Sequence, residues 1–205
     1  MAHQGIPTWY AGVRFRSRLE SRWAAFFDLV GWPWLYEPLD LAGYIPDFLL
    51  PLGWGGEEKP LLVEVKPAQY VTELPAYASK ILSSGWDGEA LIVGGAIFEQ
   101  YESGHDVPGV LLGADGSMGL ARMFHCGECG RLSFAVCPGI SIDAAGNITH
   151  HGLRPRQPCR LCGGTGEVSM GGHCVGSDTS DRLRSAVEAW TRAGNIVQWH
   201  GGAGA

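Results

Sequence analysis

The spacing of apolar residues divides the first hundred positions into helical and extended segments. From Val13 to Val30, apolar side chains recur every three or four residues, which predicts an amphipathic helix, and Gly31 followed by Pro33 marks its end. The first ten residues predict only a loose lead-in. Shorter apolar runs predict four strands, at 32–37, 44–50, 60–67 and 90–93. A second helix is predicted between the last two strands, at 73–84.

This order of helix, three strands, helix and strand predicts an α/β fold with a mixed central sheet and helices on both faces (α-β-β-β-α-β). We assign residues 1–120 to this core, 121–176 to a small second module and 177–205 to a C-terminal helix and short strand that pack on the core. The helix would be capped by Ser180 or Asp181, and the strand would cover Ile196–Trp199. The apolar stripe of this C-terminal helix would be formed by Leu183, Val187 and Trp190.

The strand at 60–67 carries charged residues inside an apolar run. Because side chains alternate along a strand, Glu64 and Lys66 share one face with Leu62, while Leu61, Val63 and Val65 share the other. A turn-rich connection at 51–59 predicts a hairpin that brings Asp47 beside Glu64. Two carboxylates there can hold Mg²⁺, and a lysine beside them can position a water molecule or steady phosphate charge.

Pro46-Asp47 and Glu64-Val65-Lys66 resemble the signature of the PD-(D/E)xK nuclease superfamily, and the resemblance covers roughly residues 12–98. It implies a restriction-endonuclease-like core that cleaves DNA with Mg²⁺ or Mn²⁺. Asp47, Glu64 and the carbonyl of Val65 would bind the metal, and Lys66 would orient the attacking water. Glu20 stands where relatives carry a further acidic residue. The competing interpretation is a solvated Asp47 with a structural Glu64–Lys66 pair, and a Glu20 paired with Arg16 or Arg18.

Two CxxC pairs, Cys126–Cys129 and Cys159–Cys162, predict a zinc-ribbon-like module because their thiolates can converge on one tetrahedral Zn²⁺. The 29 residues between the pairs predict an internal hairpin built from 131–136 and 140–149. Disulfides compete with this interpretation, but they are not expected in a cytoplasmic protein. Other side chains could replace a ligand, although a buried thiol and loop residues are the simpler interpretation: Cys137, Cys174, His125, His150, His151 and His173.

The net charge of −6 and a pI near 5.6 argue against a surface coated in basic residues for indiscriminate nucleic-acid binding. Arginines nevertheless gather in two stretches, which suits phosphates or is ordinary solvated surface: Arg14, Arg16, Arg18 and Arg22, then Arg122, Arg131, Arg154, Arg156 and Arg160. No apolar run reaches membrane-spanning length, and the N-terminus does not have the pattern of a signal peptide.

We therefore expect a cytoplasmic, Mg²⁺-dependent nuclease acting on DNA, with a structural zinc module that holds an arginine-bearing surface against the substrate. An acidic nuclease of this size suits a phage or a bacterial mobile or defence element, which is an association and not a physical inference. The alternatives are a non-catalytic nucleic-acid-binding module that retains the nuclease fold, and a zinc-ribbon adaptor for a protein partner. The sequence leaves the oligomeric state open, a homodimer included.

Overall fold

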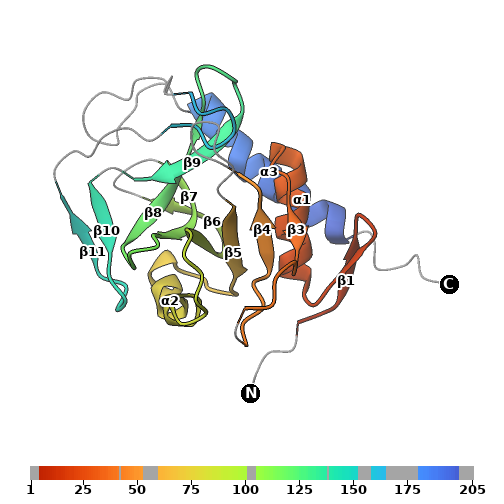
Figure 1. The fold of residues 1–205 in the computed structure, drawn as a ribbon. Helices are drawn as coiled ribbons and strands as arrows, with labels where there is room; N and C mark the ends of the chain where they lie inside the picture. Colours follow the sequence, from red (N-terminus) through yellow and green to blue (C-terminus); the bar gives the residue numbers. More distant parts are fainter. Residues whose placement is uncertain are drawn as a thin grey trace.

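A seven-stranded mixed sheet forms the centre of the computed structural model, which describes residues 5–41, 43–52, 60–100, 105–137, 139–151, 158–164 and 180–198 (Figure 1). Its strands lie side by side in chain order: β3 (Leu35–Tyr36), β4 (Phe48–Leu50), β5 (Leu61–Val65), β6 (Ala90–Gln100), β7 (His105–Leu112), β8 (Met118–His125) and β9 (Leu132–Val136). β5 and β6 run parallel, and the other neighbouring pairs of this sheet are antiparallel.

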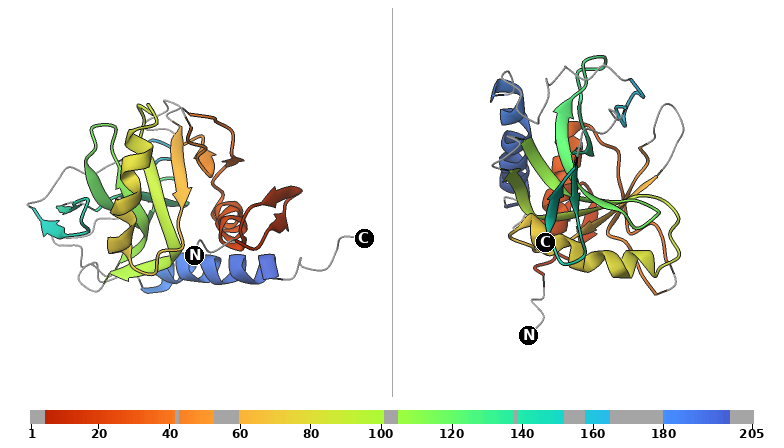
Figure 2. Two further views of the ribbon diagram at one scale, coloured as in Figure 1. Left: turned by 90° about the horizontal axis from the view of Figure 1, so that it is seen from below. Right: turned by 90° about the vertical axis from the view of Figure 1, so that its left-hand side faces the viewer.

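The two faces of the sheet are covered by different elements (Figure 2). On one face, α1 (Arg18–Val30) and α3 (Ser180–Gln198) pack over Leu61, Val63 and Val65 in a core rich in aromatic rings. On the other face, the short helices η1 (Val71–Tyr77) and α2 (Ala78–Leu82) join β5 to β6 and cover Leu62. The mixed α/β fold is thus confirmed, and from α1 to β6 the element order is the predicted helix, three strands, helix and strand.

The N-terminal prediction was wrong in two respects. Residues expected to be a loose lead-in form β1 (Thr8–Tyr10), which pairs with β2 (Val13–Phe15) in an antiparallel hairpin. The helix begins at Arg18 because the Ser17 hydroxyl accepts a hydrogen bond from the backbone N–H of Glu20, an N-cap that the apolar spacing did not reveal. Its end at Gly31, in the left-handed conformation with φ 71°, was predicted.

The C-terminal strand prediction was also wrong, because α3 continues through Gln198 and leaves no strand among residues 196–198. The buried side chains of its described part are Ala186, Ala189, Trp190, Ala193 and Val197, whereas Val187 is 48% exposed and does not belong to the apolar stripe. The side chain of Leu183 lies outside the described residues. The predicted boundary between the core and the second module, after residue 120, falls inside β8, so the central sheet extends into the segment assigned to the second module.

Candidate functional site

Glu64 lies on β5, and Asp47 immediately precedes β4, the antiparallel neighbour of β5. β4 pairs with β5 in a register that sets Phe48 opposite Val63, and one further step places Asp47 opposite Glu64. Both carboxylates are 5% exposed. The predicted hairpin and the predicted alternation of faces along β5 are therefore confirmed.

The carboxylate of Asp47 is held by two donors from opposite sides. Its Oδ2 accepts the backbone N–H of Val65 at 2.8 Å, and its Oδ1 accepts a guanidinium N–H of Arg16 at 2.9 Å. Arg16 also forms an ion pair with Glu37 at 2.6 Å. Glu37 has a left-handed backbone, with φ 46°, and its N–H donates to the carbonyl of Asp47. A strained non-glycine residue thus helps to fix the acidic site.

The carboxylate of Glu64 is held by side chains that flank the strand. Tyr44 donates its hydroxyl to Oε2 at 2.6 Å, and the ammonium of Lys66 forms an ion pair with Oε1. Burial, followed by the hydrogen bond and charge of Glu64, raises the pKa of Tyr44, so the tyrosine remains a hydrogen-bond donor. Lys66 also lies over the ring of Tyr77, with 5.4 Å between its nitrogen and the ring centre.

Burial raises the pKa of Asp47 to about 7, with the charge of Glu64 as the next cause and that of Glu20 as a weaker one. The backbone N–H of Val65 and the ammonium of Lys66 act in the opposite direction. Two carboxylates at close range in a dry site cannot both ionise cheaply unless positive charge is supplied. In this structure Arg16 and Lys66 supply positive charge beside the pair.

Glu20 lies at the first turn of α1 and serves the cap of that helix. Its carboxylate accepts the Ser17 hydroxyl at 2.8 Å and the backbone N–H of Arg16 at 3.2 Å, and it also accepts the hydroxyl of Tyr36 at 2.6 Å. It is buried and close enough to Asp47 to act on its pKa. The sequence pattern Ser17-x-x-Glu20 is that of a capping box, a signal that predicts this local role.

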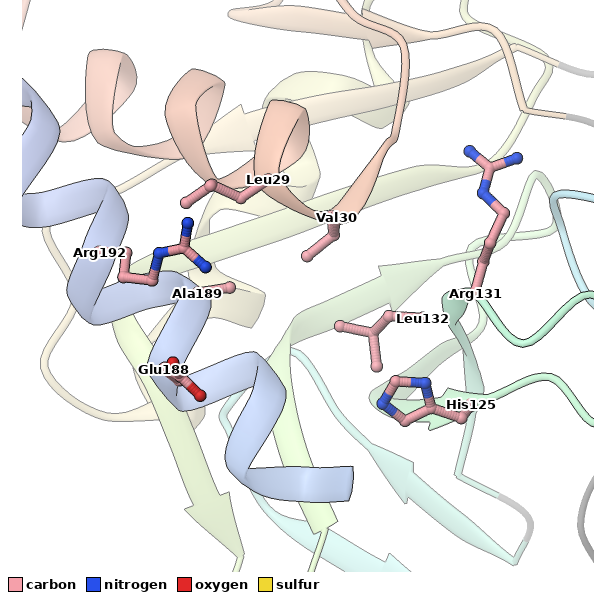
Figure 3. A pocket seen from close by; sticks show the side chains of 8 residues that line it. All are labelled: Leu29, Val30, His125, Arg131, Leu132, Glu188, Ala189 and Arg192. Atoms are coloured by element: carbon pink, nitrogen blue, oxygen red, sulfur yellow. The ribbon is translucent and has the colours of Figure 1, made fainter. Parts of the chain in front are cut away.

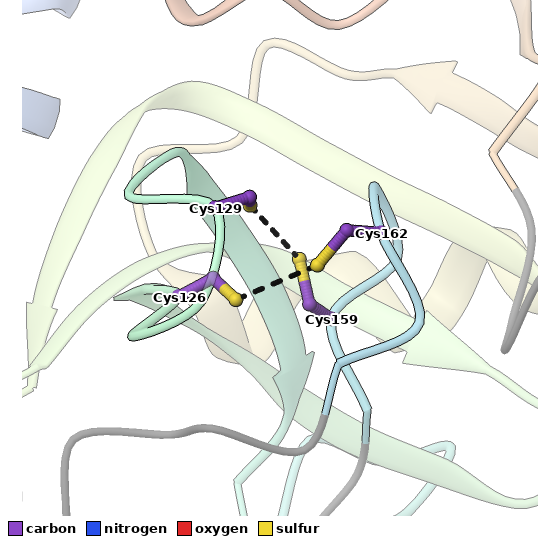
Figure 4. A group of neighbouring side chains, drawn as sticks. All are labelled: Cys126, Cys129, Cys159 and Cys162. Atoms are coloured by element: carbon purple, nitrogen blue, oxygen red, sulfur yellow. Dashed lines mark hydrogen bonds between the residues drawn. The ribbon is translucent and has the colours of Figure 1, made fainter.

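The four predicted cysteines come together at one point (Figure 4). All four sulfur atoms lie within 4.8 Å of one another, with Sγ–Sγ distances of 3.7 Å for Cys126–Cys162 and 3.9 Å for Cys129–Cys159. Tetrahedral sulfur ligands about 2.3 Å from a zinc ion are about 3.8 Å apart, so this cluster fits a Zn²⁺ site. Within the described ranges, no other set of three or more His, Cys, Asp or Glu side chains is close enough to hold a metal.

The two CxxC turns have the same local structure. A glycine follows each pair, Gly130 and Gly163, with φ 68° and 74°, and each donates its N–H to the carbonyl of the first cysteine of its turn. Leu161 and Gly164 direct their N–H groups at cysteine sulfurs, at 3.4 Å each. Such donors stabilise thiolates, and the glycines allow the tight turn that points both sulfurs inward.

The surroundings of Cys162 raise its pKa and so favour the protonated thiol when no cation is present. The N–H of Gly164 lowers its pKa, but burial and the neighbouring thiols raise it to about 12 overall. Four thiolates cannot coexist here without a cation to neutralise them. The described cysteines are free thiols, so the disulfide alternative does not hold for them.

The remaining cysteines and the second arginine stretch have other roles. Cys137 is a buried thiol outside the cluster, as predicted, while Cys174, His173, Arg154 and Arg156 lie outside the described residues. Arg122 and Arg160 are 4% and 3% exposed, so they cannot form a phosphate-binding surface. Arg160 pairs with Glu89 at 2.8 Å and lies over Phe134, and Arg131 donates to the carbonyl of Gly31. The interpretation of this stretch as a basic patch was wrong for Arg122 and Arg160, which are buried, whereas Arg131 is exposed.

A hollow of about 260 Å³ lies where α1 ends, between β9 and α3, away from Asp47 and Glu64 (Figure 3). Its polar lining consists of His125, Arg131, Glu188 and Arg192, which come from three separate elements. Only one of these side chains is a carboxylate, so the hollow does not offer the paired acids found at Asp47 and Glu64. It shares no residue with that site.

Comparison with models of known protein families, with curated proteins and with solved structures gave no match for this chain. Within the described ranges, no helix combines the length and the apolar character needed to span a bilayer.

Sequence reasoning predicted that Asp47 lies beside Glu64 and that the four cysteines converge, but it missed the side chains that hold the acids. Tyr36 and Glu37 at the end of β3, and Tyr44 before β4, had no motif to mark them. Arg16 stood out only as one member of a basic stretch. The structure brings Arg16 to Asp47 and Tyr44 to Glu64.

Proposed function

We propose that this protein is a metal-dependent nuclease that hydrolyses phosphodiester bonds of DNA, with a restriction-endonuclease-like core of the PD-(D/E)xK type. The observation that carries the proposal is the buried carboxylate pair of Asp47 and Glu64 at adjacent strands, with Lys66 bonded to Glu64. Purely structural carboxylates are seldom buried side by side, because their mutual repulsion and desolvation are costly. The element order from α1 to β6 gives further support.

Asp47 and Glu64, with the carbonyl of Val65, would hold one or two Mg²⁺ or Mn²⁺ ions through oxygen ligands. A metal bound there neutralises charge on the phosphate and lowers the pKa of a bound water. Lys66 orients the attacking water and balances charge at the scissile phosphate. Glu20 would assist from the first turn of α1, and its contacts with Tyr36 and the backbone N–H of Arg16 hold it in place.

The four-cysteine centre has a structural role in this proposal. A zinc ion there would hold the two CxxC turns together and so join residues 159–162 to β8 and β9. With both turns closed, the cluster leaves no open ligand position of the kind that catalytic zinc sites keep. It is therefore assigned to the stability of the fold and not to hydrolysis.

The second candidate is a non-catalytic nucleic-acid-binding protein that retains the fold. One observation favours it: each of the four carboxylate oxygens of Asp47 and Glu64 already has a protein donor, from Arg16, Val65, Tyr44 and Lys66. Such a network can be purely structural. The two candidates differ in whether a divalent metal displaces any of these contacts and produces cleavage.

The experiment that tests the proposal is incubation of the purified protein with linear, circular and branched DNA in Mg²⁺, Mn²⁺ or EDTA. We expect cleavage that requires the metal, and Asp47→Ala, Glu64→Ala and Lys66→Ala should each slow it on the order of a thousandfold. Asp87→Ala, which removes an exposed carboxylate away from the site, is the matched control and should cut like the wild type.

Affinity measured in EDTA separates the two candidates. Removing a carboxylate removes repulsion of the DNA backbone, so Asp47→Ala and Glu64→Ala should bind DNA as tightly as the wild type or more tightly, while Lys66→Ala binds slightly less well. A wild type that binds DNA but cuts none of the substrates with either metal would establish the non-catalytic candidate. Equal cleavage by all three variants would place the active site elsewhere.

A further inference from the structure

The β1–β2 hairpin projects beside α1 and presents one face to solvent (Figures 1 and 2). Its register pairs Thr8 with Phe15 and Trp9 with Arg14. Thr8 and Phe15 are buried toward the body of the protein, whereas Trp9 is 57% exposed and Arg14 is also exposed. An indole and a guanidinium therefore stand directly opposite each other on the outer face, where their Cβ atoms are about 5 Å apart in an antiparallel pair.

The turn of this hairpin is built to hold that face rigid. Ala11 and Gly12 form its two-residue loop, and both have positive φ, at 48° and 79°. This is the turn geometry whose twist matches that of the flanking strands. From the inner face, Tyr10 donates its hydroxyl to Asp28 of α1 at 2.8 Å. The outer pair is thus presented by an anchored element and not by a loose tail.

The hairpin leads directly into the acidic site. Residues 8–18 contain three arginines and no acidic residue, in a chain whose net charge is −6. A hollow of about 450 Å³ is lined by Arg14, Phe15 and Arg16, together with Gly5 and Pro7. Arg16 is the residue whose guanidinium contacts Asp47, and its side chain is 57% exposed. The strand that carries Arg14 thus leads from Trp9 to the carboxylates, where the guanidinium of Arg16 pairs with Asp47 and Glu37.

We infer that the hairpin is a binding platform for an unpaired stretch of a DNA strand, and that the preferred substrate of the acidic site is single-stranded or frayed DNA. Trp9 stacks on an exposed base, and Arg14 binds a phosphate next to that base. Inside a duplex both faces of a base are covered by its neighbours, so an indole on an outer face can stack only on a base that has left the helix. This inference rests on the proposed function because it names the substrate class of the same site.

A protein partner would also cover an exposed tryptophan, but the surroundings favour nucleic acid. The residue opposite Trp9 is a cation, the strand that carries it continues into Arg16, and the guanidinium of Arg16 contacts Asp47. Aromatic platforms combined with a basic groove are the shared feature of proteins that bind single strands without sequence preference. A surface that binds a protein would require neither an arginine opposite the tryptophan nor a connection to the carboxylates at Asp47.

The test is fluorescence anisotropy in EDTA with two labelled probes, an oligothymidine of about 15 nucleotides and a fully paired, blunt-ended duplex of about the same length. We expect Trp9→Ala to weaken binding of the single strand about tenfold and to change duplex affinity less than about twofold. Trp9→Phe, which retains a stacking ring, should recover most of the loss. For both probes, Arg14→Ala should reduce the slope of log affinity against log salt concentration by the amount expected for about one phosphate contact.

Two control variants match these changes elsewhere on the surface. Tyr70→Ala removes an aromatic ring that is 66% exposed beside η1, and Arg192→Ala removes an exposed arginine on α3. Both should bind the two probes like the wild type. Thermal unfolding of every variant shows whether the hairpin is intact, and Trp9→Phe keeps the test valid if Trp9→Ala unfolds.

The outcomes separate this inference from the proposed function. If Trp9→Ala binds the single strand as tightly as the wild type, or weakens both probes equally, the inference is overturned even if the protein cuts DNA. If the single strand binds through Trp9 but no substrate is cut, the hairpin remains a single-strand binding platform, while the nuclease proposal and the substrate assignment that rests on it both fail. A wild type that binds neither probe overturns the inference, and the cleavage assays with metal still decide the nuclease proposal.

Discussion

The backbone N–H of Val65 donates a hydrogen bond to the carboxylate of Asp47, with 2.8 Å between nitrogen and oxygen. This contact extends the pairing of β4 and β5 beyond the last bonded residues of the ladder, Phe48 and Val63. It also places the carboxylate of Asp47 beside Glu64 and Lys66, the two residues that flank Val65 in the chain. The ionisation of one side chain is therefore coupled to the stability of the strand end.

The metal-free protein should become less stable as this carboxyl ionises. The folded-state pKa of Asp47 is about 7, above the value near 3.9 expected for an unfolded chain, so the folded protein binds this proton more tightly. Its contribution to stability is therefore present at low pH and is lost as the pH rises from about 4 to about 7. The side chain introduced by Asp47→Asn cannot ionise. As the pH rises through this window, the free energy of unfolding of this variant should increase relative to that of the wild type, by on the order of a few kcal/mol.

Urea unfolding in EDTA at a series of pH values from about 5 to 8 measures this difference. Asp87→Asn, an exposed control, should follow the wild type at every pH. Addition of Mg²⁺ above pH 7 should raise the midpoint for the wild type but not for Asp47→Asn. A constant difference between Asp47→Asn and wild type across the range would contradict the raised pKa.

The capping role of Glu20 can be separated from a role at the metal. Ser17→Ala removes the N-cap of α1 and should lower the free energy of unfolding by about 1 kcal/mol while cleavage is retained. Glu20→Gln keeps an acceptor for the hydroxyl of Tyr36 but removes the charge. Its loss of stability should therefore be about as small as that of Ser17→Ala, but it should slow cleavage at least tenfold more than Ser17→Ala does. Paired urea titrations and cleavage assays decide the matter. Equal activity of the two variants would leave Glu20 as a capping residue alone.

The cysteine centre should hold about one zinc ion per chain. Cys126→Ser and Cys159→Ser each remove one of the four sulfurs and should release the metal and lower the thermal midpoint. Cys137→Ala is the matched control, because it removes a buried thiol outside the cluster and should retain the metal. Elemental analysis of protein prepared in reducing, chelator-free buffer provides the measurement, and a zinc-free wild type would refute the assignment.

Arg160 should matter for folding and not for binding DNA. Its guanidinium is buried against Glu89 and Phe134, so Arg160→Ala leaves Glu89 without this ion pair and should destabilise the protein by about 3 kcal/mol. The salt dependence of DNA binding should not change. Arg14→Ala should show the reverse behaviour, with stability retained and a smaller salt slope. Urea unfolding and a salt titration of the same two proteins test both halves of the prediction.

The parts of the fold that the sequence revealed are those in which local pattern and tertiary contact agree. Along β5, period-two alternation placed Glu64 and Val65 on opposite faces, and the turn-rich link to Asp47 left one simple pairing. The repeated CxxC spacing similarly needed no knowledge of distant contacts. In both cases the chemistry of a short segment determines where its side chains must go.

The failures have equally specific causes. Phe15 and Leu19 are four residues apart, which suggests one helix, but the cap at Ser17 separates a strand from a helix between them. Ala11-Gly12 lacks the Asn or Asp that usually announces a tight hairpin. β7 and β8 were not predicted, because Gly109 and Gly119 interrupt their apolar pattern. The contacts of Arg16 and Tyr44 join distant segments, and no local pattern encodes such pairings.

The packing of α3 on α1 sets the order in which this protein can mature. Trp190 contacts Trp23 and Phe26, and Arg22 lies over its ring with 3.9 Å to the ring centre. During synthesis the ribosome releases α1 and the sheet before residues 180–198, so these aromatic rings emerge without their cover. The nascent chain therefore exposes these aromatic rings until residues 180–198 have left the ribosome. A chain cut short before residue 180 lacks Trp190 and leaves this side of the core uncovered.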